Sequence, residues 1–130
     1  MKCGNSFAAA HGDEWYDWKW QFRNRITTVE QLEKVLPLSE QEKRDIADCL
    51  KTFRMAITPY YASLMDPGNP MCPIRMQAVP SVLEKRVLPC EMADPLNEEG
   101  DSPVPNIVHR YPDRVLFIVT HQCSMYCRHC

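Results

Sequence analysis

Three cysteines near the end of the sequence are the residues best suited to chemistry. Cys123, Cys127 and Cys130 follow the spacing Cys-x3-Cys-x2-Cys within Cys-Ser-Met-Tyr-Cys-Arg-His-Cys. Thiolate sulfur is the usual ligand of iron–sulfur clusters, and three thiolates on a four-iron cluster leave one iron open to a substrate or cofactor. The spacing therefore favours an iron–sulfur cluster that takes part in catalysis.

A structural zinc site is the alternative interpretation of the same residues. Either His121 or His129 would then join Cys123, Cys127 and Cys130 as the fourth ligand. Structural zinc sites usually combine two separated ligand pairs, and the sequence offers no second pair upstream. A third interpretation, three thiols without a metal, leaves the spacing unexplained.

The composition is that of an ordinary globular protein. The number of cysteines, seven, is odd, and in a reducing compartment this argues against a disulfide framework and in favour of metal ligands or plain thiols. A net charge of −2 gives no basic face for nucleic acid. Because no stretch has the ~18 apolar residues of a membrane span or an apolar signal-peptide core, we expect a cytoplasmic protein that binds neither nucleic acid nor membrane. We expect plain thiols at the scattered cysteines, Cys3, Cys49, Cys72 and Cys90.

One predicted strand positions the three cysteines. Residues 114–120, Arg-Val-Leu-Phe-Ile-Val-Thr, form a continuous β-branched and aromatic run, which is typical of a strand buried on both faces of a parallel sheet. Cys123 follows three residues later, at the carboxyl end of the strand, where parallel α/β barrels build their active sites. No second strand of this kind occurs in the sequence, so we expect the chain to be incomplete.

The residues before this strand predict a mainly helical region. Thr28 with Gln31, and Ser39 with Glu42, are capping-box patterns, and Pro59 stands at a favoured first helical position. Residues 89–112 contain several prolines and little periodicity, so an extended, irregular segment is expected there. The predicted helices cover residues 13–24, 29–36, 40–53 and 58–66, with a short one from residue 81.

Longer motifs resemble one known family. The cysteine triplet after a strand resembles the radical S-adenosylmethionine superfamily, and four further stretches resemble the lysine 2,3-aminomutase family within it. The resemblance extends from about residue 14 to residue 130. The stretches are Trp-Lys-Trp-Gln-Phe-Arg-Asn-Arg-Ile (18–26), Arg-Met-Ala-Ile-Thr-Pro-Tyr-Tyr (54–61), Asp-Ser-Pro-Val-Pro (101–105) and His-Arg-Tyr-Pro-Asp-Arg-Val (109–115).

The resemblance implies a reaction with three cofactors. Cys123, Cys127 and Cys130 match the ligands of a 4Fe–4S cluster that cleaves S-adenosylmethionine to methionine and a 5′-deoxyadenosyl radical. The radical acts on an amino acid bound to pyridoxal 5′-phosphate, and the amino group migrates from C2 to C3. The resemblance also assigns Arg110 and Arg114 to the pyridoxal phosphate group, Tyr111 to its ring, and Tyr126 and His129 to the S-adenosylmethionine pocket.

The resemblance further implies a fold and an incomplete site. We expect a mainly α N-terminal region with an extended segment at 1–108, then the first strand and cluster loop of a truncated parallel α/β barrel of the TIM type at 109–130. The lysine that binds pyridoxal phosphate and the residues that select the substrate lie beyond Cys130 in the family. The chain is therefore expected to be an N-terminal fragment of an L-lysine 2,3-aminomutase, inactive alone.

Several alternatives remain within and outside this chemistry. A glutamate 2,3-aminomutase, or the related enzyme that makes β-lysine for a translation factor, would share the same motifs. A zinc-stabilised interaction domain and a naturally short, inactive relative belong to other classes. The resemblance also implies a free amino acid as substrate, a reductant such as flavodoxin or ferredoxin, and a homo-oligomer for the longer protein.

Overall fold

The computed structural model describes residues 11–129. The chain divides into two compact units, one made of Met1–Lys85 with Cys123–Cys130 and the other of Arg86–Gln122. We call them the helical unit and the hairpin unit. The division at residue 108 that was expected from the sequence stays a prediction. No helix in the described part of the chain is long and apolar enough to cross a bilayer.

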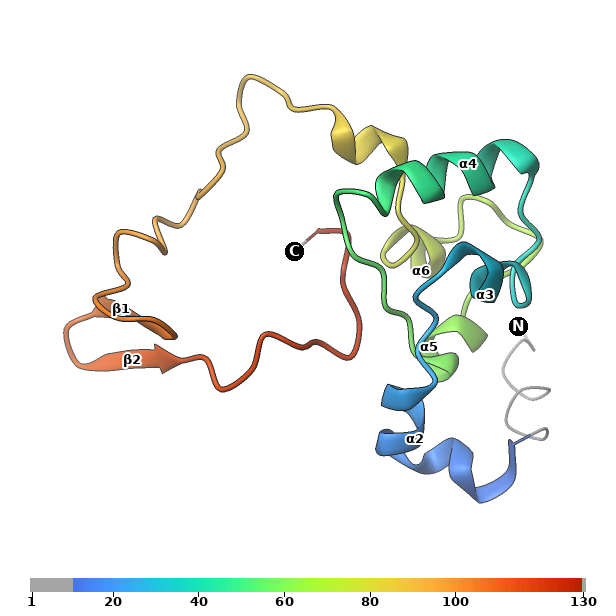
Figure 1. Cartoon of the computed structure of the whole chain (residues 1–130), viewed down its shortest axis with the longest axis horizontal. Helices are drawn as coiled ribbons and strands as arrows, with labels where there is room; N and C mark the ends of the chain where they lie inside the picture. The colour runs from blue at the N-terminus through green and yellow to red at the C-terminus, as the bar shows by residue number, and fades with distance from the viewer. Residues whose placement is uncertain (1–10, 130) are drawn as a thin grey trace. The chain divides into compact units, whose positions relative to one another are not determined.

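The helical unit consists of short helices joined by tight connections (Figure 1). The α4 helix contacts both α3 and η2, while α2 contacts η1. The predicted helices are confirmed in kind, although most are shorter than expected, and α6 was not predicted. The elements are η1 (Gly12–Tyr16), α2 (Trp18–Arg23), α3 (Val29–Glu33), α4 (Glu40–Cys49), α5 (Pro59–Ser63), α6 (Pro73–Met76) and η2 (Val82–Lys85).

The first predicted helix is interrupted at Asp17. This residue is extended, with φ −83° and ψ 115°, and its carboxylate accepts a hydrogen bond from the backbone N–H of Lys19 at 2.9 Å. Asp17 therefore caps a new helix rather than continuing the old one. The break separates two tryptophans by environment, since Trp15 is buried and Trp18 is 70% exposed.

Both predicted capping boxes are present. The Thr28 hydroxyl accepts from the N–H of Gln31, and the Ser39 hydroxyl accepts from the N–H of Glu42, while each third-position side chain bonds back to its cap. Thr58 caps α5, with Pro59 in its first turn. These bonds satisfy amide groups that a helix start leaves without partners.

The core of the helical unit joins segments that are distant in sequence. Ile26 and Ile57 exchange two backbone hydrogen bonds of 2.8 and 3.0 Å, which tie the residues before α3 to those before α5. Both side chains are buried, and Met125 from the far end of the chain packs against the same core. The core residues are Ile26, Leu32, Leu36, Ile46, Met55, Ile57, Ala62, Met65, Ala78 and Val79.

The hairpin unit contains β1 (Ile107–Tyr111) and β2 (Arg114–Phe117), which pair antiparallel (Figure 1). Tyr111 pairs with Arg114 across a two-residue turn, so β1 occupies the end of the segment that was expected to be irregular. The predicted strand at 114–120 is present but shorter, and its side chains are exposed rather than buried, with Phe117 at 63%. Within this unit no other described element pairs with β2, and a two-stranded hairpin cannot bury both faces.

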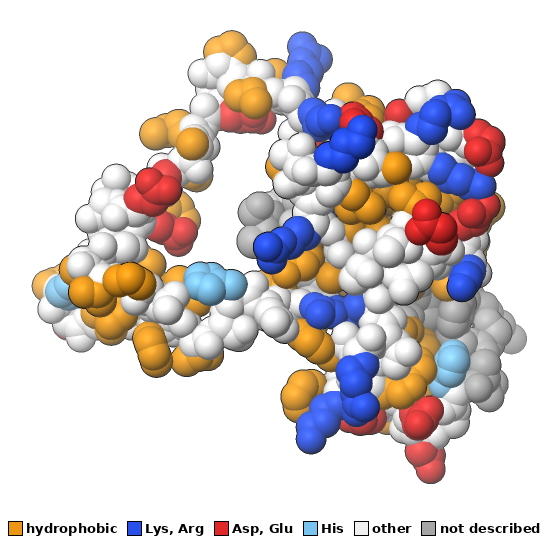
Figure 2. Space-filling view, in the orientation of Figure 1, with side chains coloured by type: hydrophobic (Ala, Val, Ile, Leu, Met, Phe, Trp, Pro, Cys, Tyr) orange, Lys and Arg blue, Asp and Glu red, His pale blue; other side chains and the backbone are white. Residues whose placement is uncertain are grey.

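The expected parallel barrel stays a prediction. A parallel neighbour requires a crossover connection, and the described residues of the hairpin unit contain only the tight turn between β1 and β2. Figure 2 shows hydrophobic side chains gathered over the hairpin. Val115, Leu116 and Phe117 of β2 are all exposed, and Val119 follows them at 80% exposure.

Candidate functional site

Two of the three predicted cluster ligands, Cys123 and Cys127, lie in the last described segment of the helical unit. We call residues 123–129 the cluster loop. Cys123 is exposed and Cys127 is half-buried, and both are free thiols, whereas Cys130 lies outside the described residues. Across residues 11–129 no group of three side chains is arranged to hold a metal, and the predicted site needs Cys130 as its third ligand. Free thiols at Cys123 and Cys127 are donors of the type that binds iron.

Backbone bonds attach the cluster loop to the helical core. The N–H of Tyr126 donates to the carbonyl of Ala56 at 3.2 Å, and the N–H of Arg128 donates to the carbonyl of Gln77 at 2.9 Å. Just before Tyr126, the Met125 side chain packs on the core. The loop that carries the cysteines is therefore positioned by the helices.

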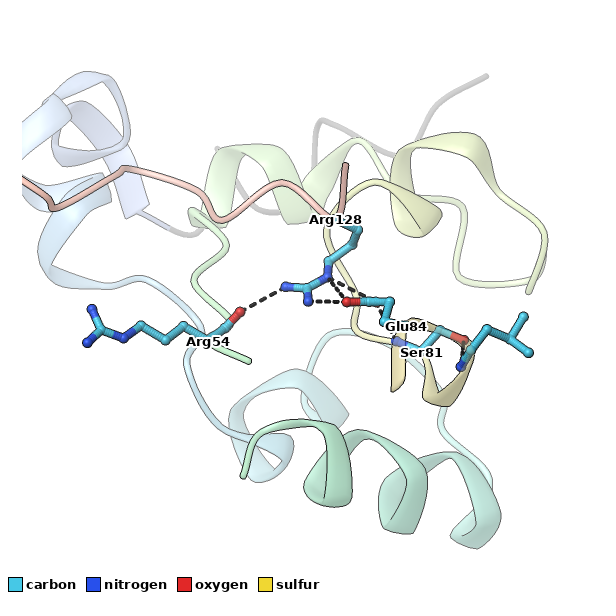
Figure 3. A network of polar contacts seen from close by, with 5 residues as sticks. Arg54, Ser81, Glu84 and Arg128 are labelled. Carbon is cyan, nitrogen blue, oxygen red and sulfur yellow. Dashed lines mark hydrogen bonds and ion pairs between the residues drawn. The ribbon is translucent and has the colours of Figure 1, made fainter. Parts of the chain in front are cut away.

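Arg128 makes the most extensive side-chain contacts of the loop (Figure 3). Its Nε donates to both oxygens of Glu84 at 3.1 and 3.0 Å, Nη2 forms an ion pair with the same carboxylate, and Nη1 donates to the Arg54 carbonyl at 2.8 Å. Glu84 also accepts from the N–H of Ser81 at 2.8 Å. With side-chain exposures of 11% for Arg128 and 21% for Glu84, this pair is largely removed from water. The paired hydrogen bonds between the guanidinium group and the carboxylate satisfy the polar atoms of both side chains.

A second arginine reaches the loop at its other end. The Nε of Arg25 donates to the Phe22 carbonyl at 2.9 Å, its guanidinium carbon lies 3.7 Å from the Phe22 ring centroid, and Nη1 donates to the Cys123 carbonyl. Sequence reasoning missed Arg25, Glu84 and Arg128. The Ser81-x-x-Glu84 pattern is visible in the sequence, but no local signal pairs it with Arg128.

Tyr61 supports the loop through Gln77. Its hydroxyl donates to the Gln77 side-chain oxygen at 2.9 Å, and the backbone of Gln77 receives the N–H of Arg128. Burial is the largest cause of the raised pKa of the Tyr61 hydroxyl. Tyr61 therefore stays protonated and keeps donating its hydrogen bond at neutral pH.

The residues expected beside S-adenosylmethionine are on the same loop. Tyr126 is half-buried, whereas His129 is exposed. Their assigned role stays a prediction. His121, the other possible zinc ligand, lies in the hairpin unit and has its Nε2 2.9 Å from the Asn106 side-chain oxygen.

The three residues expected to bind pyridoxal phosphate come together in the hairpin unit. Arg110, Tyr111 and Arg114 line one pocket of about 280 Å³. The guanidinium carbon of Arg114 lies 5.4 Å from the Tyr111 ring centroid, and its Nε is 3.0 Å from Asp113 Oδ1. Arg110 donates to a backbone carbonyl, that of Leu96. Two guanidinium groups and an aromatic ring at one pocket fit a phosphorylated aromatic ligand in chemistry, because guanidinium groups bind phosphate through paired hydrogen bonds.

The scattered cysteines lie outside both sets of residues. Cys49 and Cys72 are buried, Cys90 is exposed, and Cys3 is not among the described residues. Burial raises the pKa of the Cys49 thiol, with a further rise from the charge of Glu84. The backbone N–H of Asp66 donates to the Cys72 sulfur at 3.4 Å and lowers the pKa of that thiol.

Known proteins resemble this chain along almost its whole length. A scan against protein-family models finds no match. The chain is 56% identical over 117 residues to L-lysine 2,3-aminomutase of Clostridium subterminale. These residues make up 90% of this chain and 28% of that protein. It is 57% identical over 124 residues to L-lysine 2,3-aminomutase of Acetoanaerobium sticklandii, covering 95% of this chain and 30% of the relative.

A relative with another substrate in its name is less similar. Glutamate 2,3-aminomutase of Clostridioides difficile is 43% identical over 118 residues, which cover 91% of this chain and 28% of that protein. The chain thus spans between a quarter and a third of the length of these relatives. Along almost its whole length the chain is therefore similar to a segment of the lysine 2,3-aminomutases.

Proposed function

We propose that this chain is the cluster-binding segment of an L-lysine 2,3-aminomutase. The observation that carries the proposal is the 56% identity to such an enzyme along 90% of the chain. The geometry of the cluster loop supports it, since the loop is anchored on both sides of Cys127 by the bonds of Tyr126 and Arg128. A fixed loop can present thiolates to iron without a large cost in conformational entropy.

Each residue set has a defined task in this proposal. Cys123, Cys127 and Cys130 hold a 4Fe–4S cluster, with Tyr126 and His129 beside S-adenosylmethionine. When bound, the cluster and S-adenosylmethionine supply a radical, and pyridoxal 5′-phosphate delocalises the unpaired electron while the amino group moves from C2 to C3. In the hairpin unit, Arg110 and Arg114 bind the phosphate group, and Tyr111 contacts the pyridine ring.

Lysine is the proposed substrate because the two lysine 2,3-aminomutases compared above are more similar to this chain than the glutamate 2,3-aminomutase. Identity is 56% and 57% to the first two and 43% to the third. A glutamate 2,3-aminomutase is the second candidate. We further propose that the whole enzyme is cytoplasmic, takes its electron from flavodoxin or ferredoxin, and forms a homo-oligomer.

Anaerobic reconstitution of the 130-residue chain with ferrous iron and sulfide tests the cluster. We expect a brown protein with a broad charge-transfer absorption at about 400 nm. Cys127→Ala should lose this absorption, whereas Cys90→Ala should keep it, because Cys90 is exposed and lies in the other unit. A colourless chain that binds one zinc ion tightly would instead support the zinc-stabilised interaction domain.

A further inference from the structure

Arg25 is held in one orientation before it meets the cluster loop. The guanidinium carbon lies 3.7 Å from the Phe22 ring centroid, which is a close cation–π contact. At the same time Nε donates to the Phe22 carbonyl at 2.9 Å, in the last turn of α2, where helix carbonyl groups lack intrahelical partners. These two contacts fix the plane of the guanidinium group and leave its far edge available.

The far edge of this group contacts the first predicted cluster ligand. Nη1 of Arg25 donates to the backbone carbonyl of Cys123, 98 residues away in sequence. None of the ion pairs between described residues includes Arg25, whereas the charge of Arg128 is balanced by Glu84. Arg25 therefore brings an unbalanced positive charge to the exposed end of the cluster loop.

We propose that Arg25 is a positioning residue for the cluster, acting on Cys123 through its backbone and its electrostatic environment. This inference rests on the proposed cluster function. The hydrogen bond fixes the carbonyl of Cys123, and with it the direction in which the thiol leaves the backbone. The unbalanced charge stabilises the more negative state of a nearby iron–sulfur cluster, so it raises the reduction potential.

Hydrogen exchange in the metal-free chain tests the positioning role. Arg25→Met keeps an apolar side chain over Phe22 but removes the donor and the charge. The amide of Tyr126, which bonds to Ala56, should then exchange about tenfold faster, as loss of one charged hydrogen bond loosens the loop. The amide of Leu36, bonded to the Leu32 carbonyl, serves as the reference for global unfolding.

The reconstituted chain tests the electrostatic role. Arg25→Met should lower the midpoint potential of the cluster, and Arg25→Lys, which keeps the charge, should restore most of the shift. Arg23→Met is the matched control, because Arg23 is an exposed arginine of α2 whose guanidinium donates to the Lys19 carbonyl. It should leave both the potential and the exchange of Tyr126 unchanged.

Three results separate the possible failures. If the unsubstituted chain takes up no iron, the proposed function fails, and the Tyr126 exchange alone decides whether Arg25 holds the loop. If that chain loads iron and Arg25→Met matches it in both potential and Tyr126 exchange, the role of Arg25 is overturned. Equal acceleration at Tyr126 and Leu36 also overturns it, because Arg25 would then support the whole unit rather than the loop.

Discussion

Single charged residues fix the cluster loop, and Arg128 is the one whose loss should cost the most stability. Arg128→Ala would leave the Glu84 carboxylate, 21% exposed, without its cationic partner. We expect the free energy of unfolding to fall by about 2–3 kcal/mol, because a largely buried charge left unpaired keeps its desolvation cost. Urea unfolding followed by tryptophan fluorescence measures the change.

The control for this substitution is an exposed arginine of α4. Arg44→Ala removes only a surface bond to Gln41, so we expect a change within about 0.5 kcal/mol. Similar losses for Arg44→Ala and Arg128→Ala would show that the contacts drawn in Figure 3 do not stabilise the chain beyond ordinary surface contacts.

A second residue-scale prediction concerns pH and the pair of Arg75 with Glu42. The Arg75 side chain is 7% exposed, and its Nη2 lies 2.7 Å from Glu42 Oε1. The backbone N–H and hydroxyl of Ser39, and then Arg75, lower the pKa of Glu42 below its ordinary 4.5. A lowered folded-state pKa means that the charged carboxylate stabilises the fold above pH 4.5, and that this contribution is lost as the pH falls through the folded-state pKa.

Glu42→Gln should therefore destabilise the protein only where the carboxylate is charged. At pH 7 we expect a loss of about 1 kcal/mol, which is modest because Glu42 is 40% exposed and its charge is screened by solvent. The difference between variant and parent should shrink below pH 4.5. A difference that is constant from pH 7 to pH 3 would contradict a charge effect and would point to the shape of the amide instead.

At the scale of elements, the residue that caps the start of a helix makes its own contribution to the free energy of unfolding. Ser39 caps α4 by accepting from the N–H of Glu42 at 3.2 Å, and its own N–H donates to the Glu42 carboxylate at 2.8 Å. Ser39→Ala should cost about 1 kcal/mol in thermal or urea unfolding, because the first turn of α4 loses a side-chain acceptor. Ser39→Asp is the matched variant that keeps an acceptor, and it should stay close to the parent; an equal loss in both would exclude capping as the cause.

The same elements show what the sequence could and could not predict. The capping boxes at Thr28 and Ser39 were predictable because their partners lie three residues away. The helix break at Asp17 and the strand β1 were not predicted. For β1 the reason lies in its sequence: it ends in His109, Arg110 and Tyr111, and the chain then turns through a Pro-Asp pair, which is not a favoured hairpin sequence.

Contacts between distant residues set the limit of local patterns. Arg25 reaches Cys123 across 98 positions, and Arg128 reaches Glu84 across 44. The cysteine spacing could indicate a metal site, but the residues that hold the loop depend on tertiary packing. By contrast Arg110, Tyr111 and Arg114 lie within five positions, and the hairpin brings them to one pocket.

At the scale of the whole molecule, the residues proposed to bind two different cofactors belong to separate units. The described cysteines of the loop belong to the helical unit, and the residues expected to bind pyridoxal phosphate belong to the hairpin unit. The relatives are more than three times as long as the matched segment. We therefore expect purified residues 1–130, supplied with cofactors, reductant and lysine, to form no β-lysine; measurable turnover would show that the remaining length is unnecessary.

A chimeric enzyme distinguishes an inactive fold from a segment that lacks its partner. The matched 117 residues of the Clostridium subterminale enzyme can be replaced by their counterparts from this chain, which are 56% identical. If this chain is the equivalent segment, the chimera should convert lysine to β-lysine, and Cys127→Ala in the chimera should abolish conversion by removing one iron ligand. A chimera that binds iron and pyridoxal phosphate at parental levels but converts no lysine would contradict the assignment to this reaction. Cofactor binding without turnover would mean that this segment does not position the reacting groups as the parental segment does.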